Sequence, residues 1–137
     1  MNPNKGYLFI SNHRDITLDS ALLNLALHQN NCKTTFNAVG NNLLSEKWAS
    51  DLMRLNKSFI IDRSDKSKRD IYKSLNLASD FIFEKILNKN ESIWIAQKQG
   101  RSKDGIDFTD PSVIKMIHLH SRKKISLNEY LSSLNVV

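Results

Sequence analysis

A histidine near the start of the chain is followed at short range by two carboxylates. His13 precedes Asp15 by two positions and Asp19 by six positions. An imidazole titrates near neutral pH and is the usual general base of enzymes, and a carboxylate on its second ring nitrogen fixes the tautomer. The spacing therefore indicates a general base at His13, partnered by Asp15 or Asp19. The alternative is a histidine of a surface loop, with Asp19 as a favourable charge at a helix start.

Basic residues gather in two segments of the chain. Residues 57–73 contain six Lys and Arg against three Asp, and residues 98–124 contain seven against three Asp. Arg63 lies in the first segment, and Arg101 lies in the second beside Lys103. Arginine binds phosphate through two parallel hydrogen bonds, so these segments favour an anionic partner. The alternative is a solvated surface, which is common for runs of charge.

Alternating patterns of hydrophobicity predict the elements that must position these residues. Short apolar runs predict strands, and apolar residues at helical spacing predict the helices between them. This alternation predicts an α/β fold with a mainly parallel sheet flanked by helices. The predicted strands cover 7–11, 34–39, 58–62 and 92–96, and the predicted helices cover 17–28, 45–56, 67–88, 111–119 and 126–134.

Polar clusters follow three of the predicted strands, at residues 12–15, 62–65 and 97–103. Functional residues of parallel sheets gather at the carboxyl ends of the strands. We therefore expect the three clusters to converge on one site. In the first predicted helix, Leu18, Leu22, Leu25 and Ala26 fall on one apolar face. Trp94 lies in an apolar strand pattern and is predicted to belong to the core.

The composition excludes several classes of protein. The chain has 137 residues, a net charge of +6 and 40% hydrophobic residues, which excludes a disordered chain. A single cysteine cannot form an internal disulfide, so a disulfide-stapled secreted domain is excluded. No apolar run approaches the length of a membrane-spanning helix. His118 and His120 lack further ligands at suitable spacing, so no metal site is expected.

Three segments together resemble the first three sequence blocks of the glycerolipid acyltransferases. This family includes the glycerol-3-phosphate and 1-acylglycerol-3-phosphate acyltransferases. The order and spacing of the blocks fit from about residue 7 to residue 137, and the three segments are residues 12–19, 59–63 and 95–103.

The resemblance implies a fold, a reaction and a set of site residues. His13 would remove the proton of the acceptor hydroxyl and Asp19 would orient it. The hydroxyl would attack an acyl thioester on coenzyme A or acyl carrier protein, with no acyl-enzyme, no cofactor and no metal. The acceptor would be a glycerol phosphate or a lysophospholipid in phospholipid synthesis. The residues implied to bind its phosphate are Arg63, Gln99, Gly100, Arg101 and Lys103.

The sequence departs from the family pattern at several positions. Five residues separate His13 from Asp19 where the family has four, so either the loop bulges or Asp15 is the partner. Lys57 replaces the usual glycine of the second block, and Gln99 replaces the usual glutamate of the third block. The fourth block, an apolar strand with a proline, would follow Val137. We therefore expect residues 1–137 to form a single, truncated acyltransferase domain.

The expected protein acts in the cytoplasm, peripherally on the inner face of the membrane, with no nucleic-acid partner. The alternative is a non-catalytic basic domain that binds anionic lipid or nucleic acid, or an inactive relative of the acyltransferases. The enzyme requires His13, whereas simple binding of a polyanion weakens steeply with salt and survives loss of the histidine.

Overall fold

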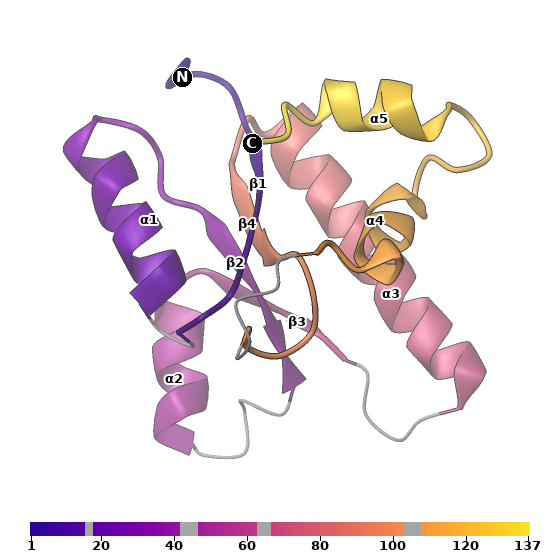
Figure 1. Ribbon diagram of the computed structural model, residues 1–137, viewed down its shortest axis with the longest axis horizontal. Coiled ribbons are helices and arrows are strands. Elements are labelled where there is room, and N and C mark those ends of the chain that lie inside the picture. The colour runs from indigo at the N-terminus through magenta and orange to yellow at the C-terminus, as the bar shows by residue number, and fades with distance from the viewer. Residues whose placement is uncertain (16–17, 42–46, 63–66, 103–107) are drawn as a thin grey trace.

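A four-stranded parallel sheet forms the centre of the described structure (Figure 1). The computed structural model describes residues 1–15, 18–41, 47–62, 67–102 and 108–137. All strand pairs are parallel, and their order across the sheet is β1-β4-β2-β3. The strands are β1 (Leu8–Ser11), β2 (Phe36–Gly40), β3 (Ser58–Ile61) and β4 (Ile93–Ala96). The predicted α/β class is confirmed, and each strand lies within its predicted segment or extends it by one residue.

Helices cover both faces of this sheet (Figure 1). Helices α1 and α2 lie on one side, and α3 and α4 lie on the other with α5 beside them. A single turn of π-helix, η2, continues α3 without a break. No helix among the described residues is long and apolar enough to cross a membrane. The helices are α1 (Leu18–Gln29), α2 (Lys47–Leu55), α3 (Lys68–Phe83), η2 (Glu84–Asn88), α4 (Pro111–His118) and α5 (Leu127–Ser133).

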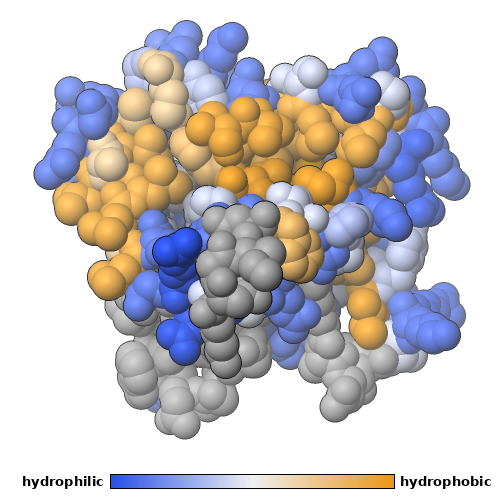
Figure 2. Space-filling model, viewed as in Figure 1, coloured by the Kyte–Doolittle hydropathy of each residue, from blue (hydrophilic) through white to orange (hydrophobic). Residues whose placement is uncertain are grey.

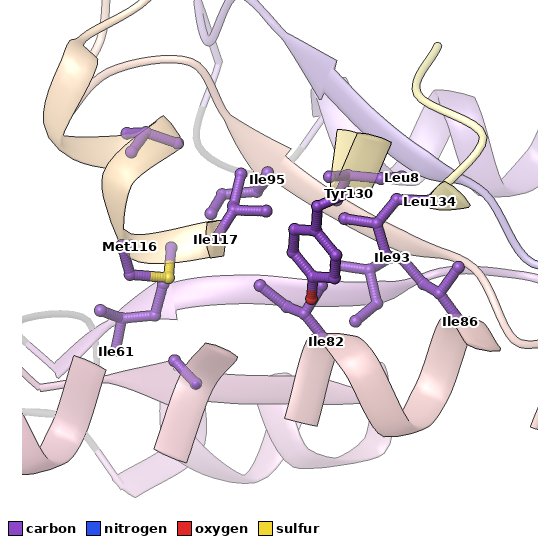
Figure 3. Packing of buried hydrophobic residues seen from close by; sticks show 12 residues of the cluster. Leu8, Ile61, Ile82, Ile86, Ile93, Ile95, Met116, Ile117, Tyr130 and Leu134 are labelled. Carbon is purple, nitrogen blue, oxygen red and sulfur yellow. The ribbon is translucent and has the colours of Figure 1, made fainter. Parts of the chain in front are cut away.

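Alternation of side chains along the strands divides the core between the two faces. Leu8, Ile93 and Ile95 point to the side of α3 and α4, where the larger cluster of buried side chains packs (Figure 3). Phe9 and Trp94 belong to a second cluster with Leu27 of α1. Burying each such side chain stabilises the fold by about 1.5–3 kcal/mol. The larger cluster is completed by Ile61, Ala78, Ile82, Ile86, Val113, Met116, Ile117, Tyr130 and Leu134.

Side-chain caps start the later helices where the sequence places them. Ser67 accepts a hydrogen bond from the backbone N–H of Asp70, and Asp110 accepts one from Ser112. Ser126 and Glu129 form a reciprocal capping box at α5. Hydrogen bonds from the Ser126 side chain and backbone hold the pKa of Glu129 below its ordinary value. The proposed starts of the first two helices, near residues 17 and 45, lie outside the described residues.

Lys57 has a left-handed backbone conformation, with a φ of 52°. It lies in the turn between α2 and β3. Glycine adopts this conformation without cost, whereas other L-residues are strained there unless a short polar side chain assists. Asparagine occupies the three other positive-φ positions outside glycine among the described residues. The backbone at residue 57 therefore has the shape that the family's usual glycine favours, although lysine occupies it.

The last two residues extend the sheet beside β1. The Val137 N–H donates to Leu8 O at 2.9 Å, and the Ile10 N–H donates to Val137 O at 3.1 Å. Leu8 and Val136 form a parallel bridge. Val136 and Val137 therefore pair with the outer edge of β1, on the side away from β4.

The apolar face predicted for the first helix points away from the core. Leu18, Leu22 and Leu25 are 54%, 59% and 50% exposed, respectively. The buried side of α1 consists of Ser20, Asn24 and Leu27, with Leu23 partly buried. Hydrophobic spacing alone cannot distinguish an apolar face that packs on the sheet from one that faces outward.

Gly6 packs where no side chain fits. A Cβ atom at residue 6 would lie 2.7 Å from Glu91 O and 2.9 Å from Ile86 O, both backbone atoms. We expect Gly6→Ala to lower the free energy of unfolding by about 1–3 kcal/mol, because backbone must shift to admit the methyl group. Urea denaturation measures this change, and the exposed neighbour variant Lys5→Ala should change it by less than about 0.5 kcal/mol. Equal stabilities of the two variants would contradict the packing described here.

Candidate active site

His13 and Asp19 are joined by a hydrogen bond. His13 Nδ1 lies 3.1 Å from Asp19 Oδ2, and their side chains are 15% and 26% exposed, respectively. The same oxygen accepts the backbone N–H groups of Arg14 at 2.7 Å and Asp15 at 3.0 Å. An oxygen that receives two N–H donors acts as an acceptor, so the contact places the imidazole proton on Nδ1. The other ring nitrogen, Nε2, is then left as the basic one.

Asp15 has a different role from Asp19. Its Oδ1 accepts the backbone N–H of Leu18 at 2.8 Å, which satisfies a free donor in the first turn of α1. Of the two partners predicted for His13, Asp19 is the one that makes the hydrogen bond to Nδ1. The backbone of residues 13–15 folds around the Asp19 carboxylate, so Asp19 reaches the imidazole with five residues between it and His13.

The polar segments after β1 and β4 lie side by side because these strands are neighbours. Their register pairs Ser11 with Ala96, so both strands end at the same level. Backbone hydrogen bonds continue beyond the strands, from Gln97 N to Ser11 O at 2.9 Å and from Ser102 N to His13 O at 2.7 Å. The first and third predicted clusters therefore converge.

A cavity of about 450 Å³ opens at this end of the sheet. His13 lines it together with Lys98, Gln99, Gly100 and Arg101 from the segment after β4. Gly100 has a φ of +75°, a conformation that favours glycine. The apolar wall consists of Ala38, Val39, Met53, Ile61, Ile95, Ala96 and Val113. The cavity therefore combines the His13 imidazole with two cations, Lys98 and Arg101, and an apolar wall.

Asp62 is the one residue of the second predicted cluster that the structure describes. β3 is an edge strand, separated from β4 by β2, so Asp62 follows a strand that neighbours neither β1 nor β4. Ile61 at the end of β3 still lines the cavity. Arg63 and Lys103, both predicted to bind phosphate, lie outside the described residues.

The sequence was compared with models of known protein families. The family model described as Acyltransferase matches residues 1–109, which include His13, Asp19 and Arg101. The chain belongs to the acyltransferase family. The match covers 109 of the 137 residues and supports acyl transfer as the general reaction. No curated protein matches the chain.

In this acyltransferase Trp94 contacts His13, which the sequence did not predict. Trp94 is 5% exposed, as expected of a core residue, but its ring meets the His13 imidazole edge to face, with centroids 5.6 Å apart. Its indole N–H donates to Ser11 Oγ at 2.9 Å, and the Ser11 hydroxyl donates to Asn12 O. Trp94 therefore supports the imidazole from β4 while Asp19 holds it from α1.

Buried polar residues of the acyltransferase form a second support, behind the cavity. Asn24 Oδ1 accepts the Thr35 N–H at 2.7 Å, and the Thr35 hydroxyl lies within 2.9 Å of the amide oxygens of Asn24 and Asn37. Asn37 Nδ2 donates to Asn56 O, and both residues line the cavity. The sequence did not predict this support, because isolated asparagines are also common in turns.

The histidines near the C-terminus lie in ordinary structural contacts. His118 Nε2 is 3.0 Å from Ile125 O, and His120 Nδ1 is 2.6 Å from Asp80 Oδ1. His120 also stacks on Phe83. No group of three or more His, Cys, Asp or Glu side chains suited to a metal ion occurs among the described residues.

The different roles of the two carboxylates can be tested with matched variants. Asp19→Asn should lower kcat of acyl transfer by about 100-fold or more, because the amide cannot fix the imidazole as a carboxylate does. Asp15→Asn should change kcat by less than about twofold, because asparagine caps a helix as well as aspartate. Release of free thiol from an acyl thioester measures both. A larger loss in Asp15→Asn than in Asp19→Asn would reverse the assignment.

Proposed function

We propose that this acyltransferase moves a fatty acyl group from an acyl thioester to the hydroxyl of a glycerol-phosphate-type acceptor in phospholipid synthesis. The donor is acyl-coenzyme A or acyl carrier protein, and the acceptor is glycerol phosphate or a lysophospholipid. The observation that carries the proposal is the cavity that His13 shares with Lys98 and Arg101. A base and two cations at one cavity suit a substrate that has both a hydroxyl and a phosphate.

In this mechanism His13 acts as the general base. Its Nε2 takes the proton of the acceptor hydroxyl as the oxygen attacks the thioester carbonyl carbon. The imidazolium that forms is stabilised by Asp19, whose oxygen lies 3.1 Å from Nδ1. The tetrahedral intermediate collapses, the carbon–sulfur bond breaks, and the proton passes to the leaving thiolate. The products are an ester and a free thiol, and His13 returns to its neutral form.

The lining of the cavity suits the two substrates in different places. Lys98, Gly100 and Arg101 offer charge and backbone to an acceptor phosphate beside His13. The apolar residues from β2, α2 and α4 suit a hydrocarbon chain or its thioester end. Holding both reactants in contact geometry lowers the barrier by several kcal/mol.

The proposal includes three further residues. Gln99 lines the cavity at the place of the family's usual glutamate, and it keeps a hydrogen-bonding side chain without the charge. Arg63 and Lys103 are proposed as further phosphate ligands on the resemblance alone. The reaction needs no metal or cofactor in this scheme, and we propose that it takes place at the cytoplasmic face of the membrane.

The general-base role is tested with His13→Ala. We expect acceptor-dependent thiol release to fall by about 10²–10⁴-fold, since general-base catalysis contributes that much. Circular dichroism and a thermal melt establish that the variant is folded. Mass spectrometry of the wild-type protein mixed with donor alone should find no acylated protein. An unchanged rate in folded His13→Ala, or a stable acyl-enzyme, would refute the mechanism.

The phosphate-binding role is tested with two arginine variants. Arg101→Ala should raise the KM for glycerol 3-phosphate by about tenfold or more, because it removes a charged hydrogen bond to the phosphate. Arg122→Ala removes the same charge at a residue that contacts Tyr72 of α3, and it should leave KM unchanged. Equal KM values for the two variants would refute the assignment of Arg101.

A further inference from the structure

One part of the cavity wall is polar and uncharged. Asn37 of β2 pairs in register with Trp94 of β4 and with Ser58 of β3, so the three side chains form a row on one face of the sheet. Trp94 packs with Leu27 of α1, so this row faces α1. Ser20 of α1 lines the same cavity. Ser20, Asn37 and Ser58 together form the polar arm of the cavity.

Two members of the polar arm are buried in the protein and yet line the cavity. Ser20 is 8% exposed and Asn37 is 2% exposed. Among the described residues, the Ser20 hydroxyl has no hydrogen-bond partner. A buried hydroxyl without a partner costs free energy in a folded protein, so it calls for a role of its own.

The amide of Asn37 is held in a fixed orientation. Its Nδ2 donates to Asn56 O at 3.2 Å, and its Oδ1 lies 2.8 Å from the Thr35 hydroxyl. These contacts use one of its two N–H hydrogens and one of the two lone pairs of its oxygen. The amide therefore keeps one donor and one acceptor for a further partner.

The polar arm lies away from the charged end of the cavity. Lys98 and Arg101 follow β4, whereas Asn37 lies three residues before Gly40, the last residue of β2. At about 3.3 Å per residue, Asn37 is about 10 Å below the end of its strand. Figure 2 shows mainly hydrophilic described residues in the lower part of the view, where the strands end in Figure 1. The arm therefore suits an uncharged part of a substrate, while the strand ends suit a charged part.

We propose that the polar arm binds the amide nearest to the sulfur of pantetheine, the group that carries the acyl thioester in coenzyme A and in acyl carrier protein. This binding rests on the proposed function, in which the donor is one of these two thioesters. The Ser20 hydroxyl donates to the carbonyl of this amide, and Asn37 Oδ1 accepts its N–H. A hydrocarbon chain in the same place leaves both buried groups unpaired, and a phosphate binds better beside the cations.

The polar arm begins beside the general base. The Trp94 indole meets the His13 imidazole with ring centroids 5.6 Å apart, and Asn37 is the neighbour of Trp94 on β2. Ser20 directly follows Asp19, which holds His13. In pantetheine an ethylene group separates the sulfur from this amide. A thioester at the acceptor hydroxyl therefore has its amide close to the arm, and binding there orients the thioester carbonyl.

Two matched donors test the arm in the wild-type protein. The butyryl thioester of N-acetylcysteamine contains the amide, whereas S-pentyl butanethioate has a side chain of the same length without it. Thiol release in the presence of glycerol 3-phosphate gives kcat/KM for each donor. We expect a preference for the amide donor of about tenfold or more, because the other donor leaves buried polar groups unpaired. Equal kcat/KM values would overturn the polar arm as a subsite and leave the proposed function in place.

Ser20→Ala removes the hydroxyl with little change in volume. The ratio of kcat/KM for the amide donor to that for the amide-free donor should fall about three- to tenfold. The matched control is Ser79→Ala, at a buried serine of α3 on the other face of the sheet that donates to Ile117 O. This control should keep the wild-type ratio. An equal loss with both donors in Ser20→Ala would overturn the subsite, because the hydroxyl would then act on the reacting atoms.

Binding without reaction separates the subsite from the proposed function. An NMR titration with pantetheine gives a Kd that should rise about three- to tenfold in Ser20→Ala and stay unchanged in Ser79→Ala. This pattern in a protein that transfers no acyl group would support the subsite and refute the function. Acyl transfer by a protein whose Kd for pantetheine is the same in the wild type and in Ser20→Ala would overturn the subsite alone.

Discussion

The rest of the candidate site depends on one carboxylate oxygen. Asp19 Oδ2 accepts the backbone N–H groups of Arg14 and Asp15 and lies 3.1 Å from His13 Nδ1. A residue in the first turn of α1 thereby determines both the path of the chain out of β1 and the orientation of the imidazole. Hydrogen bonds to a charged group are stronger than those between neutral groups, so this contact stabilises the backbone of residues 13–15. The same contact leaves Nε2 as the basic nitrogen of the ring.

The parallel pairing of β1 with β4 brings two cations to the cavity of His13. Because the strands end at the same level, their outgoing backbones stay hydrogen-bonded as far as Ser102 and His13. This pairing carries Lys98 and Arg101 to the cavity that His13 lines. Trp94 connects the two strands a second time, through its hydrogen bond to Ser11 and its edge contact with the imidazole. Membership of the acyltransferase family supports acyl transfer as the general reaction, and this arrangement is the basis of the roles that we propose for His13, Lys98 and Arg101.

Much of the fold could be predicted because local patterns determine it. Apolar runs and helical spacing predicted each strand and helix of the described residues to within a few residues, and the caps at Ser67 and Ser126 follow from local hydrogen bonding. The order of the strands was not predictable in the same way, since it depends on contacts between distant segments. For that reason the sequence did not show that β3 stands apart, or that Trp94 reaches His13. The outward side of α1 escaped prediction for a related reason: periodicity gives the spacing of apolar residues but not the direction in which they face.

The central claim is that Asp19 holds His13 with its proton on Nδ1 and its basic nitrogen on Nε2. Nitrogen-15 NMR of histidine-labelled protein measures this tautomer directly, at a pH where the imidazole is neutral. We predict that His13 is protonated at Nδ1 in the wild-type protein and that Asp19→Asn abolishes this preference, while Asp15→Asn retains it. A neutral His13 that carries its proton on Nε2 in the wild-type protein would contradict the account, because no base would then face the acceptor hydroxyl.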